Sequence, residues 1–559
     1  MTSATVDPVE PVEEPVEAAS DGTDDGTGPD PTGRYDHLAP WVFGAYVAVA
    51  APLILFHYGS YHWFMRDDFV FLADRQGRYP DLISAYGGAH WVAVPRLIYW
   101  VLWQLFGMTT YLPYQAAVVA LHLAAAVLLR LVMVRSGVDT WLASAAAAVM
   151  VLFGPGSQNI VWAFQVSFTG SLAYGLAHLL LADHEGGLDR RDALGLAFGV
   201  AALMSSGVGV SMAIVVGIAV LIRRGWKMAL VHTAPLGLLY VAWSAVGHPS
   251  TSTVFGRPTL KVLVLWVRSS VVGTFLAIGH FQVLAALLAV VLVVGLALAW
   301  GPWRTTSWAQ VRREAAMPVA LFVGGLAFSA SSGLGRWYQG SEAARSSRYL
   351  YLGAAFTLPI LAVAAQAIAR RWRALTPVLA VAFLVAIPFN LSAFDPVVFG
   401  KGYMDQRRHV LTTAVRMPFA NDVPGTLQPI PDPFASDKVT MAFLLAATRN
   451  GDLDPSTEEL TPWVVNEFKV RLGVYQHAAD AFPRSCQTVD RLEVSPAKGT
   501  TWFLPGKAQI ATRDGDRQTG PLVPFDSAAA GNLLTVVLPD LDLVVLPPPG
   551  AAELKLCTP

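Results

Sequence analysis

The sequence predicts an α-helical polytopic membrane protein of about eleven transmembrane helices, followed by a C-terminal extracytoplasmic α+β domain. Composition is the first reason: 54% of the 559 residues are apolar and 14% are charged, whereas soluble domains have about a quarter charged residues. The second reason is that apolar runs able to cross roughly 30 Å of hydrocarbon recur from residue 38 onward. A cytosolic enzyme does not fit this composition, and no segment is basic enough to predict a nucleic-acid partner.

The predicted N-terminal tail comprises residues 1–37. Residues 1–38 hold ten acidic residues against one basic residue. Apolar side chains are too few here to offset chain entropy, so we expect a disordered, acidic, cytoplasmic tail. It is not a signal peptide, because the basic n-region is missing.

The predicted transmembrane domain comprises residues 38–390. Gly and Pro residues at the ends of several runs indicate helix breaks that neighbouring helices can cover. A further apolar stretch, residues 258–278, would invert the later topology if it were a span, so we interpret it as a helix on the outer surface or dipping into it. The eleven predicted spans are at about 39–58, 112–134, 140–155, 163–182, 192–206, 208–222, 228–246, 281–300, 317–332, 349–369 and 374–390.

Basic residues in the connections predict the orientation. Cytoplasmic loops carry an excess of Lys and Arg, and here the basic clusters follow even-numbered spans. This places the N-terminal tail in the cytoplasm and, after eleven crossings of the plasma membrane, the C-terminus outside. The basic residues concerned are Arg130, Arg135, Arg190, Arg191, Arg223, Arg224, Lys227, Arg304, Arg312, Arg313, Arg370, Arg371 and Arg373.

The predicted extracytoplasmic domain comprises residues 391–559, a length that suits one folded unit. Two helix-like and three strand-like segments predict an α+β fold. They are 438–449, 460–476, 501–504, 533–538 and 543–546. The chain has two cysteines, Cys486 and Cys557, and both lie in this domain. They predict one disulfide on an oxidising face, the alternative being two unpaired buried thiols.

Two adjacent acids, Asp67 and Asp68, directly follow the first span among aromatic side chains that suit the membrane interface. Like charges this close raise at least one pKa, and the bilayer surface desolvates a carboxylate further. These conditions suit a general base. The alternative is a solvated acidic turn or a surface ion pair with Arg66.

Four further residues are candidates for substrate binding. In the first outer loop, residues 59–111, His90 and Arg96 bring a titratable group and a fixed cation to one face. Asn159 and Gln165 lie in a polar, helix-broken segment between the third and fourth spans. Amides beside aromatic side chains suit sugar recognition, but they also cap buried helix ends.

The second outer loop, residues 333–348, is basic, which runs against the positive-inside tendency. Its arginines are Arg336, Arg345 and Arg348. A lipid phosphate at headgroup depth would compensate them, because guanidinium groups bind phosphate bidentately, and Tyr349 follows at that depth. The alternatives are general contact with anionic headgroups and pairing with Glu342.

Together these motifs resemble the GT-C glycosyltransferases, multi-span enzymes that include protein O-mannosyltransferases, aminoarabinose transferases and mycobacterial arabinofuranosyltransferases. The resemblance covers about residues 38–390. It rests on the Asp-Asp pair after the first span, a His-x4-Pro-Arg segment from His90 to Arg96, and a short aromatic helix ending in Phe-Gly. A Leu-His-Leu segment at 121–123, the Gly-x-x-Asn and Trp-x-x-Gln patterns at Asn159 and Gln165, and the stretch 345–351 add to it.

The resemblance implies a polyprenyl-phosphate-linked sugar as donor and transfer at the outer surface to a cell-envelope glycan, lipid or protein. It also implies that Asp67 or Asp68 is the catalytic base and that Arg345 and Arg348 contact the phosphate. Some relatives bind a divalent metal at the first-loop acid, but Asp67, Asp68 and His90 are not an unambiguous ligand set.

The alternative function is a transporter or flippase of a lipid-linked or anionic substrate. Such a protein would place ionisable residues at the bilayer midplane, where the predicted spans are nearly free of charge. A non-catalytic scaffold for the outer domain is a third interpretation, and it leaves the Asp pair unexplained.

Overall fold

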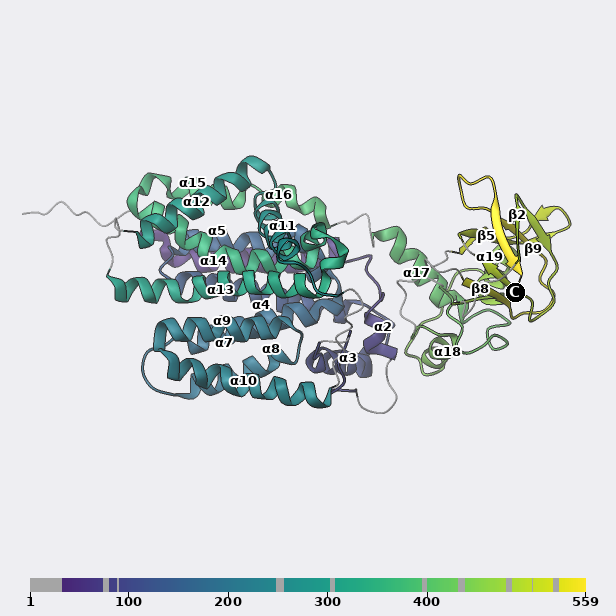
Figure 1. Ribbon diagram of the computed structural model, residues 1–559, viewed down its shortest axis with the longest axis horizontal. Coiled ribbons are helices and arrows are strands. Elements are labelled where there is room, and N and C mark those ends of the chain that lie inside the picture. The colour runs from purple at the N-terminus through teal and green to yellow at the C-terminus, as the bar shows by residue number, and fades with distance from the viewer. Residues whose placement is uncertain are drawn as a thin grey trace, which may run out of the picture.

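The computed structural model describes residues 33–73, 80–87, 90–247, 256–301, 307–394, 400–430, 438–478, 485–504, 506–525 and 532–558. A helical bundle is followed by a smaller domain that contains β-sheets (Figure 1). Most of the acidic tail predicted for residues 1–37, namely residues 1–32, lies outside the described residues. Helical structure begins at Gly33, a few residues before the predicted boundary, in a 3₁₀ turn (Gly33–Leu38) that leads into the first helix.

The bundle is built from helices that match the apolar runs of the sequence. They are α1 (Ala39–Pro52), α2 (Asp68–Ala73), α3 (Ala93–Phe106), α4 (Leu112–Arg135), α5 (Thr140–Val151), α6 (Ser157–Val161), α7 (Val166–Ala182), α8 (Arg190–Leu203), α9 (Val208–Arg224), α10 (Trp226–Val246), α11 (Leu260–Gly279), α12 (Gln282–Trp300), α13 (Trp308–Arg336), α14 (Ser347–Arg371), α15 (Thr376–Leu384) and α16 (Ile387–Asn390). Short polar side chains fix several of their starts by accepting hydrogen bonds from first-turn amides, as Asp139 does for α5 and Ser307 for α13.

Eight helical segments among the described residues are long and apolar enough to cross a membrane, and the bent pair Thr140–Val151 with Gly154–Val161 adds a ninth. The protein is therefore a multi-pass membrane protein. The spans predicted at 163–182, 192–206 and 208–222 correspond to α7, α8 and α9, with 17, 14 and 17 residues. These helices are shorter than the roughly 20 residues of a typical crossing, so helix length supports eight or nine spans rather than eleven.

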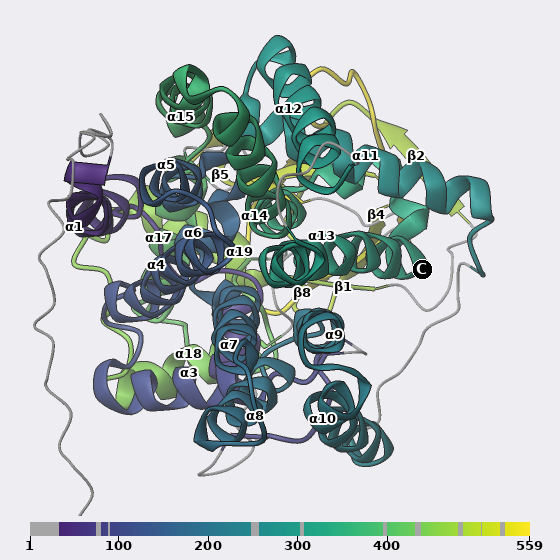
Figure 2. The same cartoon turned by 90° about the vertical axis from the view of Figure 1, so that its left-hand side faces the viewer.

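Helix α11 covers the stretch predicted to lie on the outer surface, and by length and composition it counts among the eight. Figure 1 shows α11 end-on, whereas α4, α13 and α14 run along the bundle. In Figure 2 the relation is reversed, with α13 and α14 seen end-on and α11 from its side. Helix α11 therefore lies across the other helices, in the half of the bundle that faces the β-sheet domain.

Basic helix ends meet at the end of the bundle away from the β-sheet domain, which we call the basic end. Arg135 at the end of α4 donates a 2.6 Å hydrogen bond to a carbonyl near the end of α7. Arg223 near the end of α9 lies 3.2 Å from Asp183 in the α7–α8 connection. Arg370 at the end of α14 lies 2.9 Å from Glu314 in the first turns of α13. The opposite end of the bundle, next to the β-sheet domain, is called the domain end.

The C-terminal domain contains helices and two small antiparallel sheets. Its elements are α17 (Lys401–Ala414), α18 (Met441–Arg449), α19 (Pro462–Gly473), β1 (Val474–Ala478), β2 (Ser485–Val489), β3 (Leu492–Val494), β4 (Thr501–Leu504), β5 (Ala508–Asp514), β6 (Arg517–Gln518), β7 (Val523–Phe525), β8 (Asn532–Val536), β9 (Leu543–Leu546) and β10 (Leu554–Thr558). One sheet has the strand order β1-β8-β4-β10-β2, and the other has β3-β9-β5-β6 with β7 also paired to β5. The predicted helices and strands are present, but the helix predicted at 460–476 ends at Gly473 and the strand predicted at 533–538 ends at Val536.

A disulfide joins Cys486 and Cys557, which are opposite each other on the neighbouring strands β2 and β10. The predicted disulfide is thus confirmed, and the alternative of unpaired thiols is wrong. Structural disulfides persist in oxidising compartments. The bond is therefore consistent with a domain outside the cytoplasm.

The C-terminal domain packs on α2 and on the end of α3, which both lie in the segment predicted as the first outer loop. The Met108 amide donates a 2.5 Å hydrogen bond to the Asp452 carbonyl, just after α18. An added Cβ on Gly107 would lie 2.7 Å from that same carbonyl oxygen, so this close approach requires glycine. The guanidinium of Arg407 in α17 stacks 5.7 Å from the ring centre of Phe69 in α2. The domain thereby contacts the residue that directly follows the acid pair.

Candidate active site

The acid pair lies in a tight turn at the domain end, between the π-helical end of the first span (Leu53–Tyr58) and α2. The Asp68 amide donates a 3.0 Å hydrogen bond to the Met65 carbonyl, which closes the turn. Arg66 adopts the left-handed φ of 46°, a conformation that non-glycine residues seldom adopt. This turn makes the two neighbouring carboxylates point into different surroundings.

Asp68 is completely buried, with 0% of its surface exposed. Tyr99 in α3 donates a hydrogen bond to Oδ1 of Asp68. The Met65 amide at 3.0 Å and the Trp162 indole Nε1 at 3.1 Å donate to Oδ2. The Tyr111 hydroxyl lies 3.5 Å from the same oxygen. Asp68 therefore joins α3 and the loop after α6 to the acid turn, and its two oxygens are occupied by protein donors.

Burial raises the pKa of Asp68 to about 7, because the charged form loses its hydration. The hydrogen bonds from Tyr99, Met65 and Trp162 act in the opposite direction, since they stabilise the carboxylate, whereas the charge of Asp67 raises the pKa further. The sequence predicted that one of the two acids would have a raised pKa. The structure assigns that property to Asp68.

Asp67 is half-buried, in contrast to the completely buried Asp68. Tyr86, from the same predicted loop, donates a hydrogen bond to it, and the pKa of Tyr86 is raised, first by burial and then by the charge of Asp67. Asp67 also interacts electrostatically with Arg348, at the start of α14. Both carboxylates thus face a tyrosine hydroxyl, and Asp67 in addition faces a cation.

His90 belongs to the same cluster as Asp67. A two-residue bridge between Tyr86 and His90 fixes it, with backbone hydrogen bonds of 2.8 and 3.0 Å. Burial lowers the pKa of His90 to about 4, and the charges of Arg336 and Arg348 lower it further. The imidazole is therefore neutral near pH 7. Its Nδ1 has no hydrogen-bond partner among the described residues.

Arg336, at the end of α13, and Arg348 flank the ring of Tyr349. The two guanidinium carbons lie 5.6 Å and 5.8 Å from the ring centre, and Arg336 also donates a hydrogen bond to the Tyr349 hydroxyl. The Nε of Arg348 has no hydrogen-bond partner in the part of the chain that is described. Stacking on an aromatic ring holds both cations in place while leaving donors for a ligand.

Arg345 lies apart from this cluster. It is exposed and forms an ion pair of 3.2 Å with Glu342, which is the alternative partner that the sequence suggested. Its aliphatic stem packs on α11, where an added Cβ on Gly273 would lie 2.8 Å from the Arg345 Cγ. Of the three loop arginines that the sequence suggested for a lipid phosphate, the structure brings Arg336 and Arg348 together near the acid turn.

Arg96 is buried and bonded to its own loop. Its Nη1 donates to the carbonyls of Asp81 at 2.7 Å and Ser84 at 2.9 Å, and lies 3.8 Å from the Asp81 carboxylate. These contacts fold the predicted first loop onto α3. The predicted contact of Arg96 with substrate stays a prediction.

Asn159 and Gln165 are both completely buried near the loop that carries Trp162. The Asn159 Nδ2 donates a 3.3 Å hydrogen bond to the Arg348 carbonyl, which connects this loop to α14. The Asn159 Oδ1 and both amide atoms of Gln165 lack a partner among the described residues. Buried amide atoms without partners are costly, so these two side chains remain candidates for binding polar groups of a substrate.

The acid turn does not gather metal-ligating side chains in the described structure. Among the described residues, the one group of three side chains that could hold a metal ion lies at the basic end. It consists of His184, Asp189 and Asp192. Its carboxylates are already paired with arginines, Asp192 with Arg224 at 2.5 Å and Asp189 with Arg191 at 2.7 Å.

Two tyrosines of the cluster, Tyr86 and Tyr99, were not singled out from the sequence. The only signal for them is the abundance of aromatic residues in the predicted first loop, which does not show which ring meets which carboxylate.

Comparisons with protein-family models, with characterised proteins and with solved structures find no match for this chain. The chemistry of the site is therefore derived from its own residues.

Proposed function

We propose that the protein is a membrane glycosyltransferase similar to the GT-C enzymes, which moves a sugar from a polyprenyl-phosphate donor to a cell-envelope glycan, lipid or protein. The observation that carries this proposal is the grouping of Asp67, His90, Arg336 and Arg348 at the domain end of the bundle. A carboxylate beside two stacked guanidiniums matches a reaction in which a hydroxyl loses a proton and a phosphate departs.

In the proposed reaction, Asp67 is the general base. It accepts the proton of the acceptor hydroxyl as that oxygen forms a bond to the anomeric carbon of the donor sugar. The bond from the anomeric carbon to the phosphate oxygen breaks, and its electron pair stays on the lipid phosphate. Arg336 and Arg348 stabilise the negative charge on that phosphate. Glycosidases need a second carboxylate to protonate a poor leaving group, but a phosphate leaves without one.

Asp68 is less suitable as the base, because three protein donors already occupy its oxygens and no surface of it is exposed. A general base has to reach the proton that it removes. We assign Asp68 the role of positioning residue, since its hydrogen bonds to Tyr99 and Trp162 fix the turn that presents Asp67.

The proposed topology places the basic end of the bundle in the cytoplasm and the domain end outside, in the plasma membrane. The excess of arginines at one end supports this orientation, and the disulfide agrees with it. Helices α7, α8 and α9 run beside the longer helices in Figure 1 and exchange ion pairs at the basic end. If these three cross the membrane and α11 lies on its outer surface, the chain makes the eleven crossings expected from the sequence.

A transporter would use buried ionisable groups within the bundle. The described structure does contain such a chain, because His178 bonds to His232 at 2.9 Å and His232 bonds to Asp192 at 3.0 Å. Asp192 is also bonded by Arg224 and His184. This network joins four helices at the basic end, and its one carboxylate, Asp192, is held by Arg224, His184 and His232, which suits a structural role better than transport.

The proposed function is tested with membranes that contain the protein and radiolabelled polyprenyl-phosphate sugars. Covalent transfer of label to an acceptor, above the level in membranes without the protein, supports a glycosyltransferase. Movement of intact donor across the membrane with no covalent product would instead support the transporter. Arg348→Ala should reduce transfer, and Arg345→Ala is the matched control, because Arg345 pairs with Glu342 on the surface.

A further inference from the structure

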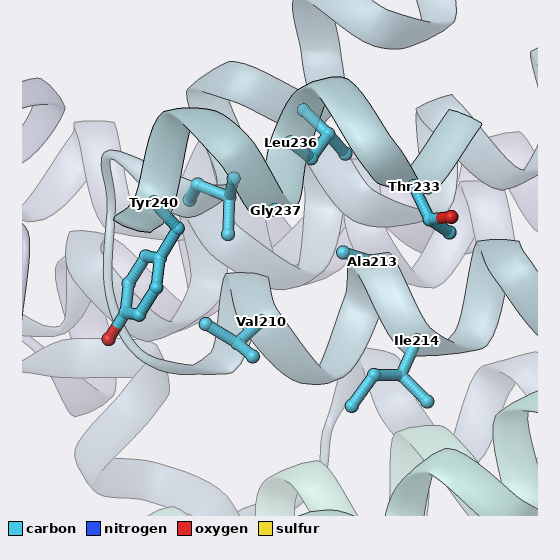
Figure 3. A pocket seen from close by; sticks show the side chains of 8 residues that line it. Val210, Ala213, Ile214, Thr233, Leu236, Gly237 and Tyr240 are labelled. Atoms are coloured by element: carbon cyan, nitrogen blue, oxygen red, sulfur yellow. The ribbon is translucent and has the colours of Figure 1, made fainter. Parts of the chain in front are cut away.

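An apolar groove runs along the bundle between α9 and α10. It consists of two adjoining spaces of about 190 and 410 Å³, which share Ile214 and Thr233 in their walls. Figure 3 shows the part nearer the domain end, with Val210, Ala213 and Ile214 on one helix beside residues of α10. Among the described residues, the side chains that line the two spaces are all uncharged.

The α9 wall of the groove leads directly to the candidate active site. Val210, Ile214, Gly217 and Leu221 follow one another at helical spacing, so they share one face of α9. Gly207 precedes Val210 by one turn on the same face. An added Cβ on Gly207 would lie 3.0 Å from Nδ1 of His90, so this face of α9 ends against the imidazole.

The α10 wall reaches the same place. Tyr240 lines the groove, and its ring centre lies 5.3 Å from that of Trp243 on the next turn of α10. Trp243 is stacked on Trp91 with a centre-to-centre distance of 5.3 Å and an angle of 7° between the planes. Trp91 directly follows His90. The α9 wall therefore ends at His90, whose pKa responds to the charges of Arg336 and Arg348, and the α10 wall ends at the neighbouring residue Trp91.

We infer that the α9–α10 groove holds the hydrocarbon chain of the polyprenyl-phosphate donor, with the phosphate at Arg336 and Arg348. This inference rests on the proposed function. From Val210 to Leu221 the groove extends roughly 16 Å along α9, at 1.5 Å per residue, from the cationic cluster toward the basic end. Its direction is that of a lipid whose phosphate lies at the membrane surface and whose chain descends into the bilayer.

The side chains of the groove favour a branched chain over a straight acyl chain. Ala213, Ala229 and Gly237 leave width between the helices, and a polyprenyl chain needs that width for the methyl group on each of its units. An added Cβ on Gly237 meets no atom within 4 Å. The groove is thus open at Gly237, and a larger side chain there would fill it without disturbing the packing of α10.

The test uses the full-length protein in lipid nanodiscs and a polyprenyl phosphate that carries a photoreactive group on its hydrocarbon chain. Cross-linked peptides are identified by mass spectrometry. We expect labelling of α9 and α10, and a several-fold loss of labelling in Ala213→Leu and in Gly237→Leu. Ala242→Leu is the matched control, because Ala242 is exposed on α10 outside the groove, and it should label normally.

Labelling that falls mainly on other helices, or that survives Ala213→Leu and Gly237→Leu, would overturn the inference. Competition by phosphatidic acid as effective as that by unlabelled polyprenyl phosphate would also overturn it, since the groove would then be a general site for bilayer lipids. Sugar transfer is measured on the same preparations. Transfer without groove labelling contradicts the inference alone, whereas groove labelling without transfer contradicts the proposed function alone.

Discussion

Tyr99 in α3 donates a hydrogen bond to Oδ1 of Asp68, and this contact separates the roles of two adjacent acids. Asp68 is bonded on both oxygens and is buried, whereas Asp67 is half-buried and faces Tyr86 and Arg348. One turn therefore supplies both a fixed anchor and a carboxylate that a substrate can approach.

Asp68 and His90 should have opposing effects on stability as pH changes. The folded-state pKa of Asp68 is raised from its ordinary value to about 7. Its contribution to the free energy of unfolding is therefore fully present when the pH is below the ordinary pKa of an aspartate, and it is lost as pH rises to about 7. The pKa of His90 is lowered to about 4. Its contribution to the free energy of unfolding is therefore lost as pH falls from about 6.5 to about 4. Between about pH 4 and 6.5 the two effects partly cancel.

The cancellation can be measured from melting temperatures in detergent across this pH range. Relative to the unaltered protein, Asp68→Asn should become more stable as pH rises, because it removes a contribution that falls with pH. His90→Gln should become less stable as pH rises. If the two variants keep the same pH profile as the unaltered protein, neither group has the assigned pKa.

Arg348 and Arg345 should differ sharply in their effect on donor binding. Arg348→Ala removes hydrogen bonds to a charged phosphate, which are worth about 1.5–3 kcal/mol, so KM for the donor should rise roughly ten- to a hundredfold. Arg348→Lys keeps the charge but loses the bidentate fork, and its KM should be intermediate. Arg345→Ala should leave KM close to that of the unaltered protein. Equal effects of the two alanine substitutions would remove the distinction between the arginines.

The disulfide should be protected from thiol reagents and should lie outside the cell. In intact spheroplasts, a membrane-impermeant maleimide should label Cys486 and Cys557 only after reduction and unfolding. The bond closes a sequence separation of 71 residues, for which loop entropy predicts a stabilisation of about 4 kcal/mol. The double variant Cys486→Ser with Cys557→Ser should therefore unfold the C-terminal domain at a lower temperature. Labelling only after the membrane is permeabilised would place the domain in the cytoplasm.

Much of the fold could be predicted because apolar runs report helices directly. The crossings could not be counted as reliably, since α8 has only 14 residues and α11 lies across the bundle. In the C-terminal domain the helix predicted at 460–476 is too long. The chain leaves the helix after Gly473 and pairs as β1 with β8, a partner nearly sixty residues away that no local pattern reveals.

The residues of the proposed site could be named from the sequence, but the different surroundings of its two acids could not be predicted. The acid pair, His90 and Arg348 were all recognised as candidates. The choice between Asp67 and Asp68 depends on Tyr99 and Trp162, which lie 31 and 94 residues from Asp68 along the chain. The local environment of Arg345 and Arg348 likewise depends on which helix packs beside each of them.

The most direct test of the proposed mechanism compares Asp67→Asn with Asp68→Asn in the transfer assay, with melting temperature measured on the same preparations. Removing a general base typically lowers the rate about 10²–10⁴-fold. Asp67→Asn should therefore lose transfer by about this factor while it keeps the melting temperature of the unaltered protein. Asp68→Asn should lower the melting temperature, because the amide cannot accept hydrogen bonds at both positions. Full transfer by Asp67→Asn would contradict the assignment of Asp67 as the base.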